Sequence, residues 1–266
     1  MNRFPPLFLS HGAPNMGLHP SPVREFMKGL ANEFPRPSAI IACSAHFETT
    51  GAVIVTDPAP GMIYDFRGFE PELGRFVYPA PGEPGLAERA AGLLEDAGIT
   101  VGRLAKRGYD HGTWVPLSLA WPDADIPVVQ LSIDPQQGPD YHFAIGQALA
   151  SLADENIAIV GTGNITHNLH VLFGGGKDPA LVSSMKQMVD EFLEWFDTKL
   201  IEFDTASLLN YRSNAPYAAE NHPTDEHLLP IFVAMGAAGN AVKPIKLHES
   251  FTFDFLAMDA WAFPQS

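Results

Sequence analysis

The stretch AIIACSAH, residues 39–46, decides how the chain folds. Its apolar run Ala39–Ser44 has the length and composition of a buried strand, and His46 follows two residues later. The same arrangement of an apolar run with a histidine just after it recurs at Pro6–Ser10 with His11 and at Ile157–Gly161 with His167. The chain therefore places histidines where predicted strands end.

Segments with helical spacing separate these runs. Further strands are predicted at Ala52–Thr56, Thr100–Leu104 and Pro127–Ile133, with one or two within Val242–Phe255. Helices are predicted to begin at Ser21 and to span Leu86–Ala97, Phe143–Ala153, Ala180–Phe203 and Asp225–Met235. Strands that alternate with helices predict an α/β fold with a central mixed, largely parallel sheet flanked by helices. No linker or internal repeat divides the 266 residues.

The segment Asp57–Pro84 breaks this alternation. It is rich in proline, glycine and aromatic residues, and a loop of this length in a compact domain is more often a functional lid than a simple connection. Its aromatic residues Tyr64, Phe66 and Phe69, together with Trp114, are suited to wall a flat ring. The alternative is that they only fasten the loop to the rest of the domain.

The composition excludes several classes of protein. Asp and Glu number 31 against 16 Lys and Arg, which gives a net charge of −15 and disfavours nucleic acid as a partner. The single cysteine, Cys43, excludes intrachain disulfides and thiolate-rich zinc sites. Because no apolar run approaches about 18 residues and the N-terminus lacks a signal-peptide pattern, we expect a cytoplasmic protein that does not enter membranes.

The histidines are the most informative residues, and the chain has ten of them. Open α/β sheets bind ligands at the carboxyl ends of their strands, where His11, His46 and His167 are predicted to lie. His111 follows the strand at Thr100–Leu104 after a short loop. A single histidine at a strand end is usually structural, but several at matching ends predict one shared, histidine-rich metal site.

The remaining histidines carry weaker predictions. His222 lies in the stretch ENHPT just before the last predicted helix. His227 falls inside that helix, where we expect it to pack or to support a ligand rather than to bind metal. His170, three residues after His167, is expected to line the pocket or to orient a neighbour.

Five blocks of the sequence together resemble one known family. The blocks are SHGAP (10–14), SAHF (44–47), DHGTWVPL (110–117), THNL (166–169) and NHPTDEHLLP (221–230). In this order they are similar to the class III extradiol ring-cleaving dioxygenases, in particular to the DOPA-dioxygenase type. The resemblance implies one catalytic α/β domain over residues 1–266, with a mononuclear non-haem Fe(II) site.

The resemblance also implies roles for individual residues. The metal ligands it implies are His11, His46, His167 and His222, and the catalytic acid/base residues are His111 and His167. His167 therefore stays open between a ligand and a base. The wider class uses two histidines and one glutamate. This sequence has His222 in place of that glutamate, with Glu220 and Glu48 as rival ligands.

The implied reaction inserts O2 into a DOPA-like catechol next to its hydroxyls and yields a ring-opened semialdehyde. Fe(II) would support activity, and Zn(II) could replace it in purified protein because imidazole binds both ions. For the substrate, Trp114 is expected to wall the ring, Tyr217 to donate to a catechol oxygen, and Arg67 or Arg212 to hold a carboxylate. The expected assembly is a monomer or homodimer.

Two alternatives to a dioxygenase remain open from the sequence. One is a zinc-dependent hydrolase on a related α/β scaffold, with Glu48 or Glu220 as the general base. The other is a protein that binds a metal or small ligand without catalysis, which predicts a coordinatively closed site.

Overall fold

Eight strands form one sheet in the computed structural model, which describes residues 3–174, 179–239 and 243–264. The order across the sheet is β4-β3-β5-β2-β6-β1-β10-β7. The strands are β1 Leu7–Ser10, β2 Ala39–Glu48, β3 Ala52–Val55, β4 Val101–Leu104, β5 Val128–Ile133, β6 Ile157–Gly163, β7 Ile245–His248 and β10 Ala260–Ala262. A separate hairpin pairs β8 Phe251–Thr252 with β9 Leu256–Ala257.

The centre of the sheet is parallel and its edges are not. β2 pairs in parallel with β5 and with β6, and β6 pairs in parallel with β1. On one side β10 runs antiparallel to β1 and β7, and on the other side β3 runs antiparallel to β5. The predicted fold class, a single α/β domain with a mixed and largely parallel sheet, is confirmed.

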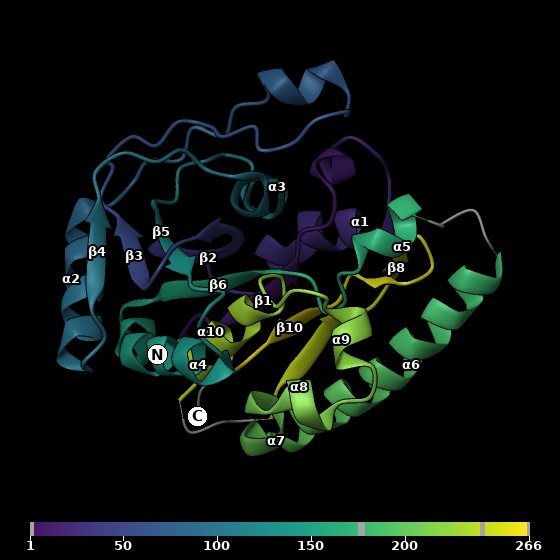
Figure 1. The fold of residues 1–266 in the computed structure, drawn as a ribbon. Helices are drawn as coiled ribbons and strands as arrows, with labels where there is room; N and C mark the ends of the chain where they lie inside the picture. The colour runs from purple at the N-terminus through teal and green to yellow at the C-terminus, as the bar shows by residue number, and fades with distance from the viewer. Residues whose placement is uncertain (1–2, 175–178, 240–242, 265–266) are drawn as a thin grey trace.

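Helices cover both faces of this sheet (Figure 1). They are α1 Pro22–Gly29, α2 Pro84–Asp96, α3 His111–Ala120, α4 Pro139–Leu149, α5 Leu169–Gly174, α6 Pro179–Glu202, α7 Thr205–Leu209, α8 Tyr211–Asn214, α9 Ala218–Asn221 and α10 Leu229–Ala237. Ile41 and Cys43 of β2 share a core with α2, α4, α6 and α10, whereas Ile40 and Ala42 share one with α1 and α3. Alternate side chains of one strand are thus buried on opposite faces, which explains the unbroken apolar runs. No helix among the described residues is long and apolar enough to cross a bilayer.

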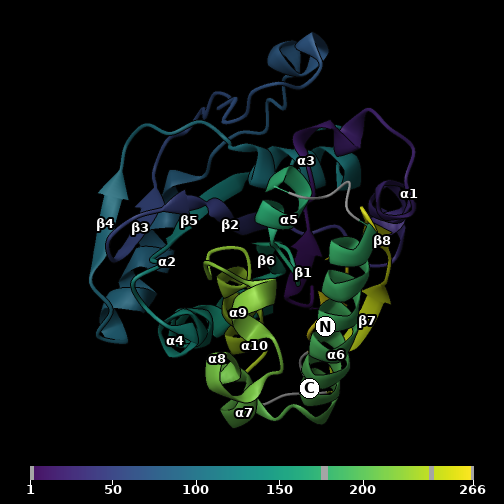
Figure 2. The ribbon, with the colours of Figure 1, turned by 45° about the vertical axis from the view of Figure 1, so that its right-hand side comes forward.

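The segment 57–84 lies over α3, with its short helical turn Pro71–Arg75 outermost (Figures 1 and 2). The Tyr64 hydroxyl donates to the Phe76 carbonyl at 2.8 Å, and the Phe76 ring stacks on Trp114 of α3 at 4.8 Å between centroids. Aromatic contacts therefore fasten this segment, hereafter the lid, to α3, and the Val128 amide of β5 also donates to the Pro81 carbonyl at 2.8 Å.

Helix α3 and strand β4 differ from the sequence predictions in ways that change how His111 is placed. Helix α3 has no predicted counterpart, because it is buried almost all round and contains Pro116, so its sequence shows no apolar stripe. Strand β4 runs opposite to β5, since it is parallel to β3. His111 therefore does not reach the carboxyl edge as the end of a parallel strand. It arrives there at the start of α3.

Helices α4 and α10 approach each other closely through two glycines. A Cβ atom on Gly146 would lie 2.1 Å from the Val233 carbonyl oxygen, and one on Gly236 would lie 2.0 Å from the Phe143 carbonyl oxygen. Both distances are far shorter than a van der Waals contact. The atoms approached belong to the backbone, so they cannot move aside as a side chain could. This crossing holds α10, and the turn before it, against β6.

We predict that Gly146→Ala lowers the free energy of unfolding by about 1–3 kcal/mol, because the new methyl group forces the two helices apart. Gly92→Ala is the matched control, since Gly92 lies within α2 with open space around its Cβ position. That variant should be neutral or more stable by up to about 1 kcal/mol. Urea unfolding of both variants measures the difference, and equal stabilities would contradict the role given to Gly146.

Candidate active site

Five imidazole rings line one cavity of about 370 Å³ beneath the lid: His11, His46, His111, His167 and His227. The Nε2 atoms of His11 and His46 lie 3.0 Å apart. His11, His46 and His227 can each offer one ring nitrogen such that these atoms lie within 4.8 Å of one another. The predicted convergence of His11, His46, His111 and His167 on one crevice is therefore found in the structure.

The carboxyl end of β6 positions two of these rings. The His11 amide donates to the Gly163 carbonyl at 3.0 Å, and the Asn164 amide donates to the His227 carbonyl at 2.9 Å. A Cβ atom on Gly163 would lie 2.0 Å from that same His227 oxygen, so only glycine permits the approach. His46 comes from β2, the neighbour of β6, near the same edge.

His222 does not join the cluster, contrary to the prediction that it is a metal ligand. Its fully buried ring places Nε2 2.7 Å from the Ile165 carbonyl oxygen and packs near Phe192 and Tyr211. His227 occupies the place expected for His222. The physical reason is that α10 begins at Leu229 and not at Asp225, so His227 lies in the preceding turn and faces the cavity.

The two carboxylates proposed as rival ligands or bases also lie outside the cluster. Glu220 and Glu48 are both exposed, and neither belongs to a group of potential metal ligands among the described residues. Histidine is therefore the ligand type among the described residues that line the cavity, although Asp65 and Glu226 lie close enough to these rings to form groups with them.

A lid carboxylate that the sequence did not single out holds His111. The Asp65 Oδ1 atom lies 2.9 Å from His111 Nδ1 and accepts from the His111 amide at 3.2 Å. Burial alone would raise the pKa of Asp65, but the hydrogen bonds and charge of His111 outweigh it and lower that pKa. With Nδ1 engaged, Nε2 is the His111 nitrogen left for the cavity. The only sequence signal for Asp65 was its place in the aromatic lid.

Asp110, the sequence neighbour of His111, has a different role. It caps α3 by accepting from the Thr113 amide at 2.9 Å, and it also accepts from the Ser44 hydroxyl at 2.7 Å. Arg107 pairs with its second oxygen at 2.8 Å. Asp110 therefore fixes the start of α3 against β2, which carries His46.

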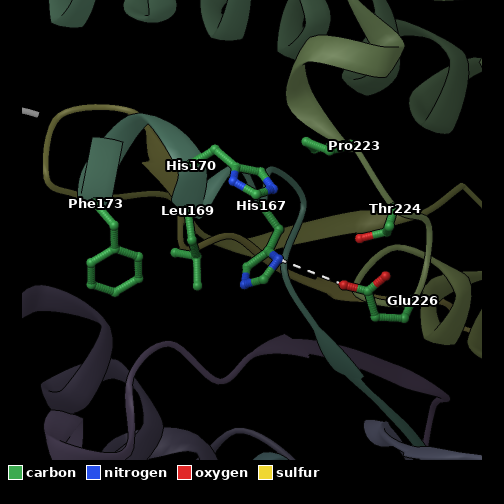
Figure 3. A pocket seen from close by; sticks show the side chains of 7 residues that line it. All are labelled: His167, Leu169, His170, Phe173, Pro223, Thr224 and Glu226. Carbon is green, nitrogen blue, oxygen red and sulfur yellow. Dashed lines mark ion pairs between the residues drawn. The ribbon is translucent and has the colours of Figure 1, made fainter. Parts of the chain in front are cut away.

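Glu226 supports the other side of the cluster. Its Oε1 atom lies 3.0 Å from His227 Nδ1 and 3.9 Å from His167 Nδ1. The rings of His167 and His227 stack with their centroids 3.4 Å apart. Figure 3 shows His167 and Glu226 in a neighbouring pocket of about 400 Å³, which His170 and Thr224 also line. A carboxylate bonded to the outer nitrogen of a histidine orients its other nitrogen, as in many metal sites.

Burial keeps four of the five clustered imidazoles uncharged: His11, His46, His167 and His227. It lowers the pKa of His46 to about 4, with repulsion from His111 as the next cause, and it lowers the pKa of His167 to about 4 against the opposing effect of Glu226. Burial followed by the neighbouring imidazoles depresses the pKa of His11 and of His227 well below the usual value. Neutral rings at pH 7 offer their lone pairs without competition from protons, so the residues fit a divalent metal.

The predicted substrate residues lie differently from expectation. Phe66 and Phe69 of the lid line the cavity, but Trp114 is 2% exposed and lies behind them, stacked on Phe76. Tyr217 precedes α9 and is not among the described residues that line the cavity.

Comparison with known proteins agrees with this site. Residues 13–263 match the family model described as the catalytic LigB subunit of aromatic ring-opening dioxygenase. The chain belongs to this family, whose enzymes depend on a metal and act on a small aromatic substrate with O2. It is thus an extradiol aromatic ring-opening dioxygenase, and the hydrolase and non-catalytic alternatives are not favoured.

Individual relatives give the same result. A 4,5-DOPA dioxygenase extradiol of Beta vulgaris is 37% identical over 260 residues, which cover 96% of this chain and 95% of the relative. A protein of the same name from Escherichia coli K12 is 39% identical over 237 residues, covering 88% and 85%. The crystal structure of an uncharacterized protein from Escherichia coli K12 matches with a TM-score of 0.78 at 32% identity, covering 98% of this chain and 99% of that one.

We predict that the free energy of unfolding of the metal-free protein decreases as the pH falls from about 6.5 to about 4. In this range the histidines bind protons in the unfolded chain but stay unprotonated when buried in the folded protein. Each such histidine contributes a slope of about 1.4 kcal/mol per pH unit within this window and none above it. Urea unfolding in the presence of a chelator measures the slope. In the His167→Gln variant this slope should be smaller by the contribution of one histidine, about 1.4 kcal/mol per pH unit. A slope equal to that of the wild type would contradict the lowered pKa of His167.

Proposed function

We propose that His11, His46 and His227 hold one iron(II) ion and that the protein opens a single-ring catechol next to its hydroxyls. The observation that carries this proposal is the group of three uncharged imidazoles at the buried end of a cavity that also exposes His111 and His167. The product is a ring-opened semialdehyde. Because the relatives are named for 4,5-DOPA, we propose a catechol of DOPA-like size.

The choice of metal follows from redox chemistry rather than from affinity. Imidazole binds both iron(II) and zinc(II), so either ion fits this donor set. When bound, iron(II) would bring the catechol and O2 together and pass electron density between them, which triplet O2 requires. Zinc cannot change its oxidation state, so a zinc form would fold but not oxygenate.

The protein itself supplies two proton transfers. A catechol hydroxyl must lose a proton on binding, and ring opening requires a proton at oxygen. We assign His111 Nε2 to one of these steps, because Asp65 holds its Nδ1 and leaves Nε2 for the cavity. His167 is the second candidate, and we propose it as a base rather than as a ligand, because its ring stacks face to face on His227.

Loading with metal tests the reaction. Metal-free protein reconstituted anaerobically with iron(II) should consume one O2 for each catechol on exposure to air and form a coloured product, since both oxygen atoms enter the ring-opened molecule. The zinc-loaded protein is the control and should consume none. An absence of O2 uptake with every member of a set of differently substituted catechols would refute the proposal.

Two histidine variants test the ligand set. We predict that His227→Ala weakens metal binding by at least about 100-fold and abolishes O2 uptake, because one of three ligands is lost. His222→Gln should keep the metal, since Gln retains a donor for the Ile165 carbonyl. Calorimetric titration with zinc(II) measures both affinities. The opposite pattern, with metal lost in the His222 variant and kept in the His227 variant, would restore His222 as the ligand.

A further inference from the structure

Aromatic side chains surround the mouth of the cavity. Phe66 and Phe69 come from the lid, Phe173 from α5 and Phe253 from the turn between β8 and β9, and we name these four residues the aromatic rim. Phe173 is 81% exposed and Phe253 is 52% exposed. Large apolar groups gathered around a cavity mouth mark a surface that a ligand covers.

The backbone at Phe253 has an unfavourable conformation that places the phenyl ring at the cavity. Phe253 has φ +55° and Asp254 has φ +64°, so the first two of the three residues between β8 and β9 are left-handed. A bulky side chain in this conformation is unfavourable. The turn nevertheless places a phenyl ring at the cavity. Strain of this kind clusters where a side chain binds ligand.

The side chains that line the cavity offer no fixed charge to a substrate. None of the described residues that line the cavity is Lys or Arg, and its polar side chains other than histidine are Asn15, Asn164 and Thr252. Of the two arginines suggested by the sequence, Arg67 is not in the described lining, and Arg212 is bound to Asp225 and to the His222 carbonyl. A substrate carboxylate would therefore lie against apolar side chains without a cationic partner, which is unfavourable.

The neighbouring pocket holds one carboxylate, that of Glu226. Figure 3 shows its ion pair with His167, and its Oε1 atom also lies 3.0 Å from His227 Nδ1. Asp65 is likewise engaged with His111. A carboxylate substituent thus lacks a cationic counterpart among the described lining residues, and an ammonium substituent would meet only carboxylates that histidines already engage.

We propose that the aromatic rim selects catechols with an uncharged, apolar ring substituent, and that Phe253 is a specificity-determining residue. This inference rests on the proposed function for the binding of the catechol hydroxyls at the metal end of the cavity. It differs from what the names of the relatives indicate, because the DOPA in those names carries an amino-acid side chain.

Anaerobic binding to the iron-loaded protein tests the proposal with ligands of matched length. The uncharged member of the series is 4-propylcatechol. On a side chain of similar length, L-DOPA carries an ammonium and a carboxylate, dopamine carries the ammonium alone, and 3-(3,4-dihydroxyphenyl)propanoate carries the carboxylate alone. We expect 4-propylcatechol to bind at least about tenfold more tightly than any charged member. Equal or tighter binding of L-DOPA or the propanoate would overturn the proposal. Tightest binding of dopamine would also overturn it and would direct the substituent to the pocket of Glu226.

Two variants of one hairpin test the role of Phe253. Phe253→Asn suits the left-handed backbone, so the turn should survive, and the affinity ratio of 4-propylcatechol to unsubstituted catechol should fall about fivefold to tenfold. Phe251→Asn is the control, because Phe251 is also partly exposed but contacts Lys186 and does not line the cavity. It should leave the ratio unchanged, and melting temperatures verify that both variants fold. An unchanged ratio in the Phe253 variant would overturn its assignment.

Oxygen uptake in the same samples separates this inference from the proposed function. If every catechol fails to consume O2 while the binding preference holds, the proposed reaction is overturned and the apolar selectivity is supported. If O2 is consumed without any preference, the reaction is supported and the selectivity is overturned.

Discussion

The backbone contact between the end of β6 and the turn before α10 determines the site. Through Gly163 and Asn164, one strand end accepts from the His11 amide and donates to the His227 carbonyl. The approach requires a glycine, since any Cβ on Gly163 would collide with the His227 oxygen. Two of the three proposed ligands thus take their positions from one short piece of backbone, and the third comes from the adjacent strand β2.

Close imidazoles are compatible with one another only when they are uncharged. Burial keeps His11, His46, His167 and His227 uncharged. Two carboxylates at the edge of the cluster, Asp65 and Glu226, engage the outer nitrogens of His111 and His227. The inner nitrogens then face the cavity. Because Asp65 belongs to the lid, the same segment that covers the substrate cavity also orients a proposed proton-transfer group. Covering the cavity and orienting His111 are therefore coupled in this fold.

The metal end and the mouth of the cavity have different chemistry. The proposed metal end is made of imidazole rings on the central strands and on the turns that pack against them. The mouth is built from the lid, α5 and a strained hairpin, all of which lie outside the large sheet. Loops and short elements vary more easily than a packed sheet. A common reaction with a separate preference for the ring substituent is the expected result of this division.

The sequence by itself determined the strands and the histidines that follow them. Apolar runs at β1, β2 and β6 are strong local signals, and the rule that parallel strands end at one edge brought His11, His46 and His167 together. Only the tertiary structure placed His227 rather than His222 at the cavity, because this depends on where α10 begins and on its packing against β6. Helix α3, Asp65 and the antiparallel β10 also depended on long-range contacts, which leave no periodic pattern in a short stretch of chain.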